Sequence, residues 1–270
     1  MPLSVCATPI GNLEDVTLRV LRELAEADLV LCEDTRRTRK LLERHGVTAR
    51  LLSYHEHNEA QRTAEVMPRL AAGERVALVS DAGLPAISDP GARLVGAALD
   101  AAVPVTVLPG PSAVETALAA SGFPFERYQF VGYLPRGKGA LDELWLELAA
   151  WPHAVVAFES AQRLPGALAG LGSVLPERPV AVCRELTKVF EEVVRGAARD
   201  VATHFVEPPR GEVTLVIGPD RVSRIGAEEA EAAAAAVAEL VAAGASHRRA
   251  TDVVARLTGL PRRQVYRASL

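Results

Sequence analysis

The chain has 270 residues, of which 49% are hydrophobic and 24% charged, and its net charge is −4. This composition excludes general disorder, and no apolar run reaches the roughly 18–20 residues that a membrane-spanning helix needs. The acidic balance argues against a protein that merely coats nucleic acid. Three cysteines without a CxxC pair and an N-terminus without a basic secretory segment predict a reduced, cytoplasmic protein.

Short apolar runs alternate with helical patterns over residues 1–121. Strands are predicted at Leu3–Thr8, Asp28–Cys32, Arg50–Tyr54, Arg75–Ser80 and Val103–Leu108. Helices are predicted at Asp15–Glu26, Arg36–His45, Asn58–Ala72, Gly91–Ala101 and Ser112–Ala120. Such alternation is typical of an α/β domain with a mainly parallel sheet and helices on both faces.

Gly122-Phe123-Pro124 interrupts this rhythm and predicts a domain boundary, with a second α/β domain over residues 122–221. Its strands are expected at Tyr128–Tyr133, His153–Phe158, Val180–Arg184, Val189–Arg195 and Glu212–Ile217. Its helices are expected at Leu141–Ala149, Ser160–Leu171 and Ala197–His204. Val180–Arg184 and Val189–Arg195 leave no room for a helix between them, which predicts a hairpin and therefore a mixed sheet.

Residues 222–270 are predicted to form a small helical segment. An Ala-rich helix over Glu228–Ala243 precedes two short helices, Arg248–Leu257 and Pro261–Arg267, that are typical of a helix-turn-helix. From Ser246 onward the segment holds six arginines against one aspartate. Two interpretations stay open. The segment either contacts RNA or serves as a packing or dimerisation arm with a solvated basic face.

Three loops at the carboxyl ends of predicted strands are candidates for ligand binding, because open α/β sheets bind ligands there. They are Ala7–Asp15, Val79–Gly91 and Leu108–Ala113. Neither a GxGxxG after the first strand nor a GxxxxGK[ST] is present, which argues against dinucleotide and P-loop sites. Asp89-Pro90 suits a helix N-cap with proline at N1, whereas Asp81 has no such explanation and is free to bind an amine or a ribose hydroxyl.

The chain resembles the tetrapyrrole-methylase-fold superfamily of S-adenosylmethionine-dependent methyltransferases in five stretches: ATPIGNLEDVTLRVLRELAEADLVLCEDTR, SDAGLPAISDPG, PGPSA, FES-x-x-R-L and CRELTK. Within it, the chain is similar to the branch that methylates a cytidine 2′-hydroxyl of small-subunit (16S) ribosomal RNA. The resemblance spans about Leu3 to Gly218, and the basic tail also matches this branch. Tetrapyrrole-modifying members usually carry GxGPG and Gly-Gly-Asp-Pro where this chain has ATPIGN and VSDAG.

The resemblance implies two α/β domains with S-adenosylmethionine folded into the cleft between them. The residues implied to hold this cofactor are Pro9, Ile10, Gly11, Ser80, Asp81, Leu84, Ser112, Ala113, Phe158 and Leu186. Asp81 would offset the positive sulfonium and α-ammonium groups. A homodimer without a metal is also implied, and His55-Glu56-His57 has no evident third ligand.

Methyl transfer to a ribose oxygen depends mainly on orientation, and a carboxylate or a neutral lysine can take the hydroxyl proton. Candidates for this proton acceptor are Glu185, Lys188 and Asp34. Basic residues are candidates for contacts with RNA phosphates, although surface ion pairs are the simpler explanation for some of them. These are Arg36, Arg37, Arg39, Lys40, Arg184, Arg248, Arg249, Arg262 and Arg263.

Two other functions stay open. A methylase of the same fold that acts on a tetrapyrrole or another small molecule would not need the basic tail. A non-catalytic protein that binds RNA or the ribosome would be expected to lose Asp81 and the PGPSA loop, and both are intact.

Overall fold

The computed structural model describes residues 2–220, 227–260 and 262–269, except the side chains of residues 227, 228, 263, 264 and 267. The first part, here called the N-terminal lobe, is a five-stranded sheet with strand order β3-β2-β4-β1-β5. The strands are β1 (Leu3–Cys6), β2 (Leu29–Cys32), β3 (Leu51–Ser53), β4 (Val76–Val79) and β5 (Val105–Leu108). All four strand pairings are parallel, as the alternating pattern predicts.

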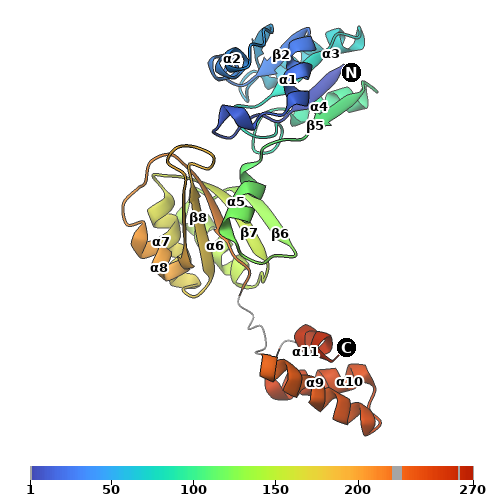
Figure 1. Cartoon of the computed structure of the whole chain (residues 1–270), viewed down its shortest axis with the longest axis vertical. Coiled ribbons are helices and arrows are strands. Elements are labelled where there is room, and N and C mark those ends of the chain that lie inside the picture. The colour runs from blue at the N-terminus through green and yellow to red at the C-terminus, as the bar shows by residue number, and fades with distance from the viewer. Residues whose placement is uncertain (1, 221–226, 261, 270) are drawn as a thin grey trace.

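Helices cover both faces of this sheet (Figure 1). They are α1 (Leu18–Glu26), α2 (Thr35–Arg44), α3 (Glu59–Ala71) and α4 (Ala92–Asp100). Alternate residues of β2 face opposite cores, since Leu31 packs with residues of α3 and α4 while Val30 packs with residues of α1 and α2. The helix expected from Asp15 is divided into a short 3-10 turn and α1, because the Thr17 hydroxyl caps α1 at Val20 N–H.

The second lobe contains a mixed sheet with strand order β6-β7-β10-β8-β9. Its strands are β6 (Tyr128–Tyr133), β7 (Ala154–Ser160), β8 (Pro179–Arg184), β9 (Glu192–Ala197) and β10 (Glu212–Ile217). β6 runs parallel to β7, the other pairings are antiparallel, and β8 and β9 form the expected hairpin. β9 begins at Glu192 rather than Val189 because residues 185–191 form a tight loop closed by backbone hydrogen bonds.

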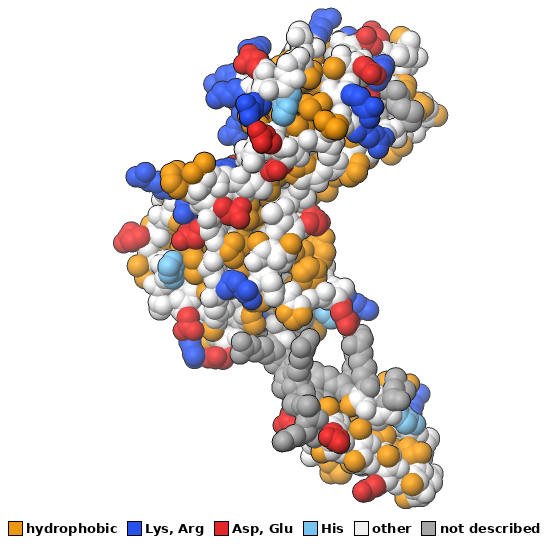
Figure 2. Space-filling view, viewed as in Figure 1, with side chains coloured by type: hydrophobic (Ala, Val, Ile, Leu, Met, Phe, Trp, Pro, Cys, Tyr) orange, Lys and Arg blue, Asp and Glu red, His pale blue; other side chains and the backbone are white. Residues whose placement is uncertain are grey.

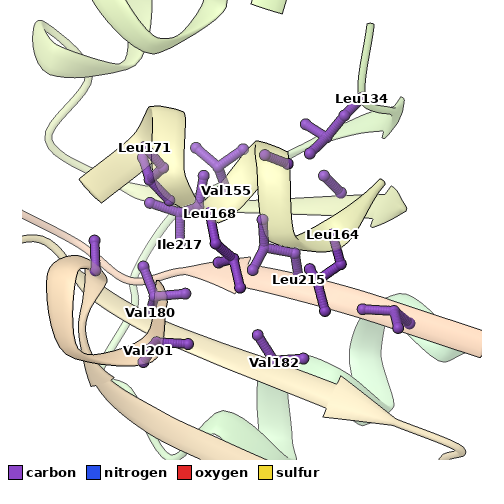
Figure 3. Close-up of a cluster of buried hydrophobic side chains, with 14 of the residues drawn as sticks. Leu134, Val155, Leu164, Leu168, Leu171, Val180, Val182, Val201, Leu215 and Ile217 are labelled. Atoms are coloured by element: carbon purple, nitrogen blue, oxygen red, sulfur yellow. The ribbon is translucent and has the colours of Figure 1, made fainter. Parts of the chain in front are cut away.

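The helices of the second lobe are α5 (Ala113–Ser121), α6 (Lys138–Ala149), α7 (Leu164–Val174) and α8 (Ala198–His204). α6, α7 and α8 share one core with the sheet, where Leu168 and Leu171 lie among Val180, Leu215 and Ile217 (Figure 3). α5 covers the opposite face. α5 therefore packs on the second sheet although it precedes the expected boundary at Gly122, and the division into domains at that residue stays a prediction.

The tail is a unit of three helices, α9 (Ala227–Ala242), α10 (His247–Thr258) and α11 (Arg262–Ala268) (Figure 1). Ala233, Val237, Ala250, Val254 and Val265 form its own small core. Ser246 caps α10, and Gly259 ends it in the left-handed conformation. In the part of the chain that the structure describes, no helix combines the length and the apolar character needed to cross a membrane.

Candidate functional site

A cavity of about 490 Å³ lies between the two lobes, at the carboxyl ends of strands of the N-terminal sheet. Its volume is in the range of small-molecule sites. Seven of the residues implied to hold the cofactor line it, namely Ile10, Asp81, Leu84, Ser112, Ala113, Phe158 and Leu186. The other three, Pro9, Gly11 and Ser80, border an adjoining hollow that shares Ile10 and Asp81 with the cavity. The fold thus gathers all ten residues, although their roles stay proposals.

Close contacts between loops hold the two lobes together beside this cavity. A β-carbon on Gly11 would lie 2.6 Å from both Thr187 Oγ1 and Lys188 Cγ, so only glycine fits there. The next backbone N–H, from Asn12, donates to Thr187 Oγ1 at 2.9 Å. Within the N-terminal lobe, Thr8 pairs with Gly83 through two backbone hydrogen bonds. The PIGN, SDAG and ELTK loops therefore form one connected rim.

Backbone strain is concentrated in two of these loops. Ala86 and Ser88 have φ of 69° and 59°, and Glu185 and Thr187 have φ of 51° and 65°. Residues other than glycine rarely adopt this left-handed conformation, and such strain often marks functional loops. Gly211 has φ of 93°, and a β-carbon there would lie 2.4 Å from the carboxyl group of Glu185. The strained loops thus lie where the two lobes meet around the cavity.

Five carboxyl groups line the cavity, together with the single described cation Arg37. They are Glu33, Asp81, Asp89, Glu159 and Glu212. Burial and the charge of Asp81 raise the pKa of Glu33, and burial and the charge of Glu33 raise the pKa of Asp89 to about 6. Glu159 is paired with Arg163 at 2.5 Å. This acidic lining favours a ligand with positive charge.

The expected helix-capping role of Asp89 is wrong. The N-cap of α4 is Gly91 with φ of 138°, and its backbone N–H donates to Glu59 Oε1 at 3.0 Å. Asp89 instead lines the cavity. Glu33 and Asp89 were not among the predicted site residues, although one directly follows a predicted strand and the other lies in a predicted ligand loop.

Asp81 connects the cavity to the start of α2. Its Oδ1 accepts a hydrogen bond from the backbone N–H of Asp34 at 2.9 Å, and its Oδ2 lies 3.4 Å from Arg37 Nε. The side chain is one-fifth exposed, so it still faces the cavity. Asp81 therefore has a structural role in addition to any contact with a cofactor.

The three expected proton acceptors lie outside the lining of the main cavity. Lys188 Nζ donates to Glu185 Oε1 and Glu212 Oε2, both at 2.7 Å. Burial alone would lower the pKa of Lys188, but these two hydrogen bonds and charges outweigh burial and raise it. The bond from Lys188 likewise lowers the pKa of Glu185. A charged Lys188 is a poor proton acceptor.

Asp34 is occupied as the N-cap of α2. Its Oδ1 accepts from the backbone N–H of Arg36 at 2.8 Å, and its Oδ2 accepts from Arg36 Nη2 at 2.7 Å. The side-chain and backbone hydrogen bonds from Arg36 hold the pKa of Asp34 far below its usual range. This carboxylate stays ionised but is already bonded on both oxygens.

The basic candidates fall into two groups. Lys and Arg side chains gather over α2 of the N-terminal lobe (Figure 2), where Arg36, Arg37, Arg39 and Lys40 are exposed. Arg184 is bonded to Glu192 Oε2 at 2.9 Å on the second lobe. In the tail, Arg248 and Arg249 are exposed and Arg262 pairs with Asp252, whereas the side chain of Arg263 lies outside the described residues. The α2 group thus lies on the N-terminal lobe, whereas the described tail arginines lie on the separate three-helix unit (Figure 1).

Comparison with known proteins identifies the family. The model of the tetrapyrrole (corrin/porphyrin) methylases matches residues 2–202. The chain belongs to this family. Its fold is also similar to the crystal structure of the methyltransferase CobJ, with a TM-score of 0.62 at 20% identity over 81% of this chain and 94% of that one.

Two curated relatives carry the name ribosomal RNA small subunit methyltransferase I. The one from Micromonospora olivasterospora is 42% identical over 98% of this chain and 85% of its own length. The one from Thermotoga maritima is 44% identical over 80% of this chain and 97% of its own length. The predicted fold, the methyltransferase activity and S-adenosylmethionine as methyl donor are confirmed by this family membership. Within the described residues, no group of three or more His, Cys, Asp and Glu side chains is placed to hold a metal ion.

Proposed function

We propose that the chain methylates the 2′-hydroxyl of a cytidine in small-subunit ribosomal RNA. The observation that carries this proposal is the 42% identity over 98% of the chain to a relative named for ribosomal RNA small subunit methylation. The loops ATPIGN and VSDAG, which depart from the tetrapyrrole-modifying pattern, also support it. The alternative of a tetrapyrrole acceptor rests on the description of the matched family and on fold likeness.

The acidic cavity suits S-adenosylmethionine. Bound there, this donor supplies a methyl group on a positively charged sulfonium, and its α-ammonium is also positive. Asp81 is placed to offset these charges, because it lines both the cavity and the adjoining hollow. Ile10 and Leu186, both under a tenth exposed, supply apolar contacts from the two lobes. Ser112 and Ala113 at the start of α5 complete the wall.

We place the proton acceptor on the carboxyls that line the cavity. The ribose O2′ attacks the methyl carbon, the bond from sulfur to that carbon breaks, and S-adenosylhomocysteine leaves while the O2′ proton passes to a carboxylate. Asp89 and Glu33 have the position for this role, and a raised pKa makes a carboxylate a stronger base. Glu185, across the rim, is the second choice, because its Oε1 already accepts hydrogen bonds from Lys188 Nζ and from the backbone N–H of Glu212.

RNA binding is proposed for the exposed cations of α2, with Arg39 and Lys40 least engaged in ion pairs among the described contacts. The tail is proposed to add affinity rather than chemistry. The alignment with the Thermotoga relative covers 97% of that relative but leaves a fifth of this chain unmatched. That relative is therefore too short to contain a further unit as large as the tail. A homodimer and a cytoplasmic location, the latter in keeping with three buried free cysteines, complete the proposal.

The test is methyl transfer from labelled S-adenosylmethionine to separate acceptors. We expect label in small-subunit ribosomal RNA, presented as naked RNA or as assembled subunits, and none in a tetrapyrrole. Label in the tetrapyrrole alone would replace this function with the small-molecule alternative. Asp89→Asn, which removes a proposed proton acceptor, should give much less label at equal donor affinity.

A further inference from the structure

An irregularity in β6 turns an aromatic side chain toward the cavity. The pairing of β6 with β7 shifts register between Phe130 and Tyr133, and Gly132 within this bulge has φ of 68°. A bulge re-aims the side chains that follow it. Tyr133 consequently lines the cavity, whereas Tyr128 at the other end of the same strand does not.

The ring of Tyr133 is supported from behind and open in front. Its centroid lies 5.6 Å from that of Phe158 at an interplanar angle of 64°, and Phe130 packs edge-on against Phe158 at 4.9 Å. Edge-to-face contacts of this kind hold aromatic rings in place. Nevertheless Tyr133 is 63% exposed. A fixed aromatic ring with a free surface at the rim of a cavity is suited to stacking.

The bulge lies close to the strained loop of the N-terminal lobe. A β-carbon on Gly132 would stand 3.8 Å from Ser88 Oγ, and the neighbouring Ile87 is 49% exposed and lines the same cavity. Burial and the charges of Glu212 and Asp89 raise the pKa of Tyr133, so its phenol stays neutral. Tyr133 and Ile87 thus form an uncharged pair at the rim of a cavity whose lining is acidic.

We propose that Tyr133 is the platform on which the nucleobase of the target nucleotide stacks, with Ile87 as a second apolar contact from the other lobe. This inference rests on the proposed RNA substrate. Sequence-specific recognition of RNA commonly targets unpaired nucleotides, whose bases are held by stacking on aromatic side chains. The exposed rim faces solvent, from which RNA arrives, whereas Ile10 and Leu186, two of the apolar residues proposed for the methyl donor, are buried.

The test compares two binding steps in variants of the full chain. Loss of one stacked base should raise the KM of Tyr133→Ala for small-subunit RNA about fivefold to 150-fold. The Kd of Tyr133→Ala for S-adenosylmethionine, measured by calorimetry, should stay within about twofold of wild type. Such an unchanged donor affinity also shows that the variant is folded. Tyr133→Phe should behave as wild type, because it keeps the ring. Tyr128→Ala is the matched control on the same strand and should leave both constants unchanged.

Each other outcome has a definite meaning. If Tyr133→Ala weakens donor binding as much as RNA binding, the ring serves the methyl donor and the inference is overturned. If wild type methylates RNA and Tyr133→Ala matches it, the inference is overturned while the proposed function stands. A wild-type chain that neither binds nor methylates small-subunit RNA overturns both. Ile87→Ala should give a smaller rise in KM, and it keeps the inference testable if Tyr133→Ala fails to fold.

Discussion

Asp89→Asn should make the protein more stable while it damages the proposed site. Burial, Glu33 and Asp81 raise the pKa of Asp89 from its ordinary value of 3.8 to about 6, so the ionised carboxylate is unfavourable in the folded chain. One pKa unit corresponds to about 1.4 kcal/mol, so the full shift corresponds to about 3 kcal/mol. Asp89 is only partly buried, and solvent screening reduces the expected effect to about 1–2 kcal/mol. Asparagine removes the charge and keeps an oxygen that accepts hydrogen bonds.

The sign of the pH dependence follows from the raised pKa. Above about pH 6 the carboxyl is ionised in both the folded and the unfolded chain, so the unfavourable burial of its charge lowers the free energy of unfolding by the full amount. Below about pH 4 it is protonated in both, and the cost disappears. The variant should therefore exceed wild type by about 1–2 kcal/mol at about pH 8, and this gain should fade as the pH falls from about 6 to about 4.

Urea unfolding at several pH values measures this difference. Glu143→Gln, at an exposed position on α6, is the matched control and should change the free energy of unfolding by less than about 0.5 kcal/mol at every pH. Equal stability of Asp89→Asn and wild type at about pH 8, or a gain that persists at about pH 4, would refute the reasoning. Strong loss of turnover in the more stable variant would fit a carboxylate kept for function rather than for folding.

Three other predictions concern the donor, the second lobe and the tail. Asp81→Ala should weaken S-adenosylmethionine binding by about 1–3 kcal/mol in calorimetry, and unchanged affinity would remove Asp81 from the site. Arg178→Met should lower the free energy of unfolding by about 2–4 kcal/mol, because the buried guanidinium donates to three backbone carbonyls at 2.7–2.9 Å; a loss under about 1 kcal/mol in urea unfolding would contradict this. Deleting α9–α11 should raise the KM for RNA and flatten its salt dependence, with donor affinity unaltered. An unchanged salt slope would instead support the arm interpretation of the tail.

The hydrophobic pattern of the sequence predicted the fold well where neighbouring residues in the sequence determine the secondary structure. The parallel sheet followed from strand–helix alternation, and the β8–β9 hairpin followed from the short distance between two apolar runs. Which sheet a helix packs against was harder to predict from the sequence. The pattern places a helix at Ala113–Ser121, but only the assembled structure shows that Val114 and Leu118 join the core of the second sheet.

The sequence predicted which loops form the candidate site, but it predicted only some of the side chains that line it. Glycines that permit close contact, such as Gly11, lie in motifs that the sequence displays. The raised pKa values of Glu33 and Asp89 depend on burial and on the charges of other carboxyls, Asp81 for Glu33 and Glu33 for Asp89, which come from segments far apart in the chain. Likewise, Tyr133 reaches the cavity through a bulge that the residue pattern of β6 does not reveal.

The chemical position of the transferred methyl group tests the central claim most directly. Small-subunit ribosomal RNA that has been treated with the protein and S-adenosylmethionine is digested to nucleosides, and the products are identified by mass spectrometry. A cleft that presents a ribose oxygen to the methyl donor predicts one new product, 2′-O-methylcytidine, which is much less abundant when Asp89→Asn replaces the wild-type chain. A methyl group on a base would contradict this claim. So would a methylated tetrapyrrole in a parallel reaction when the RNA yields no methylated nucleoside.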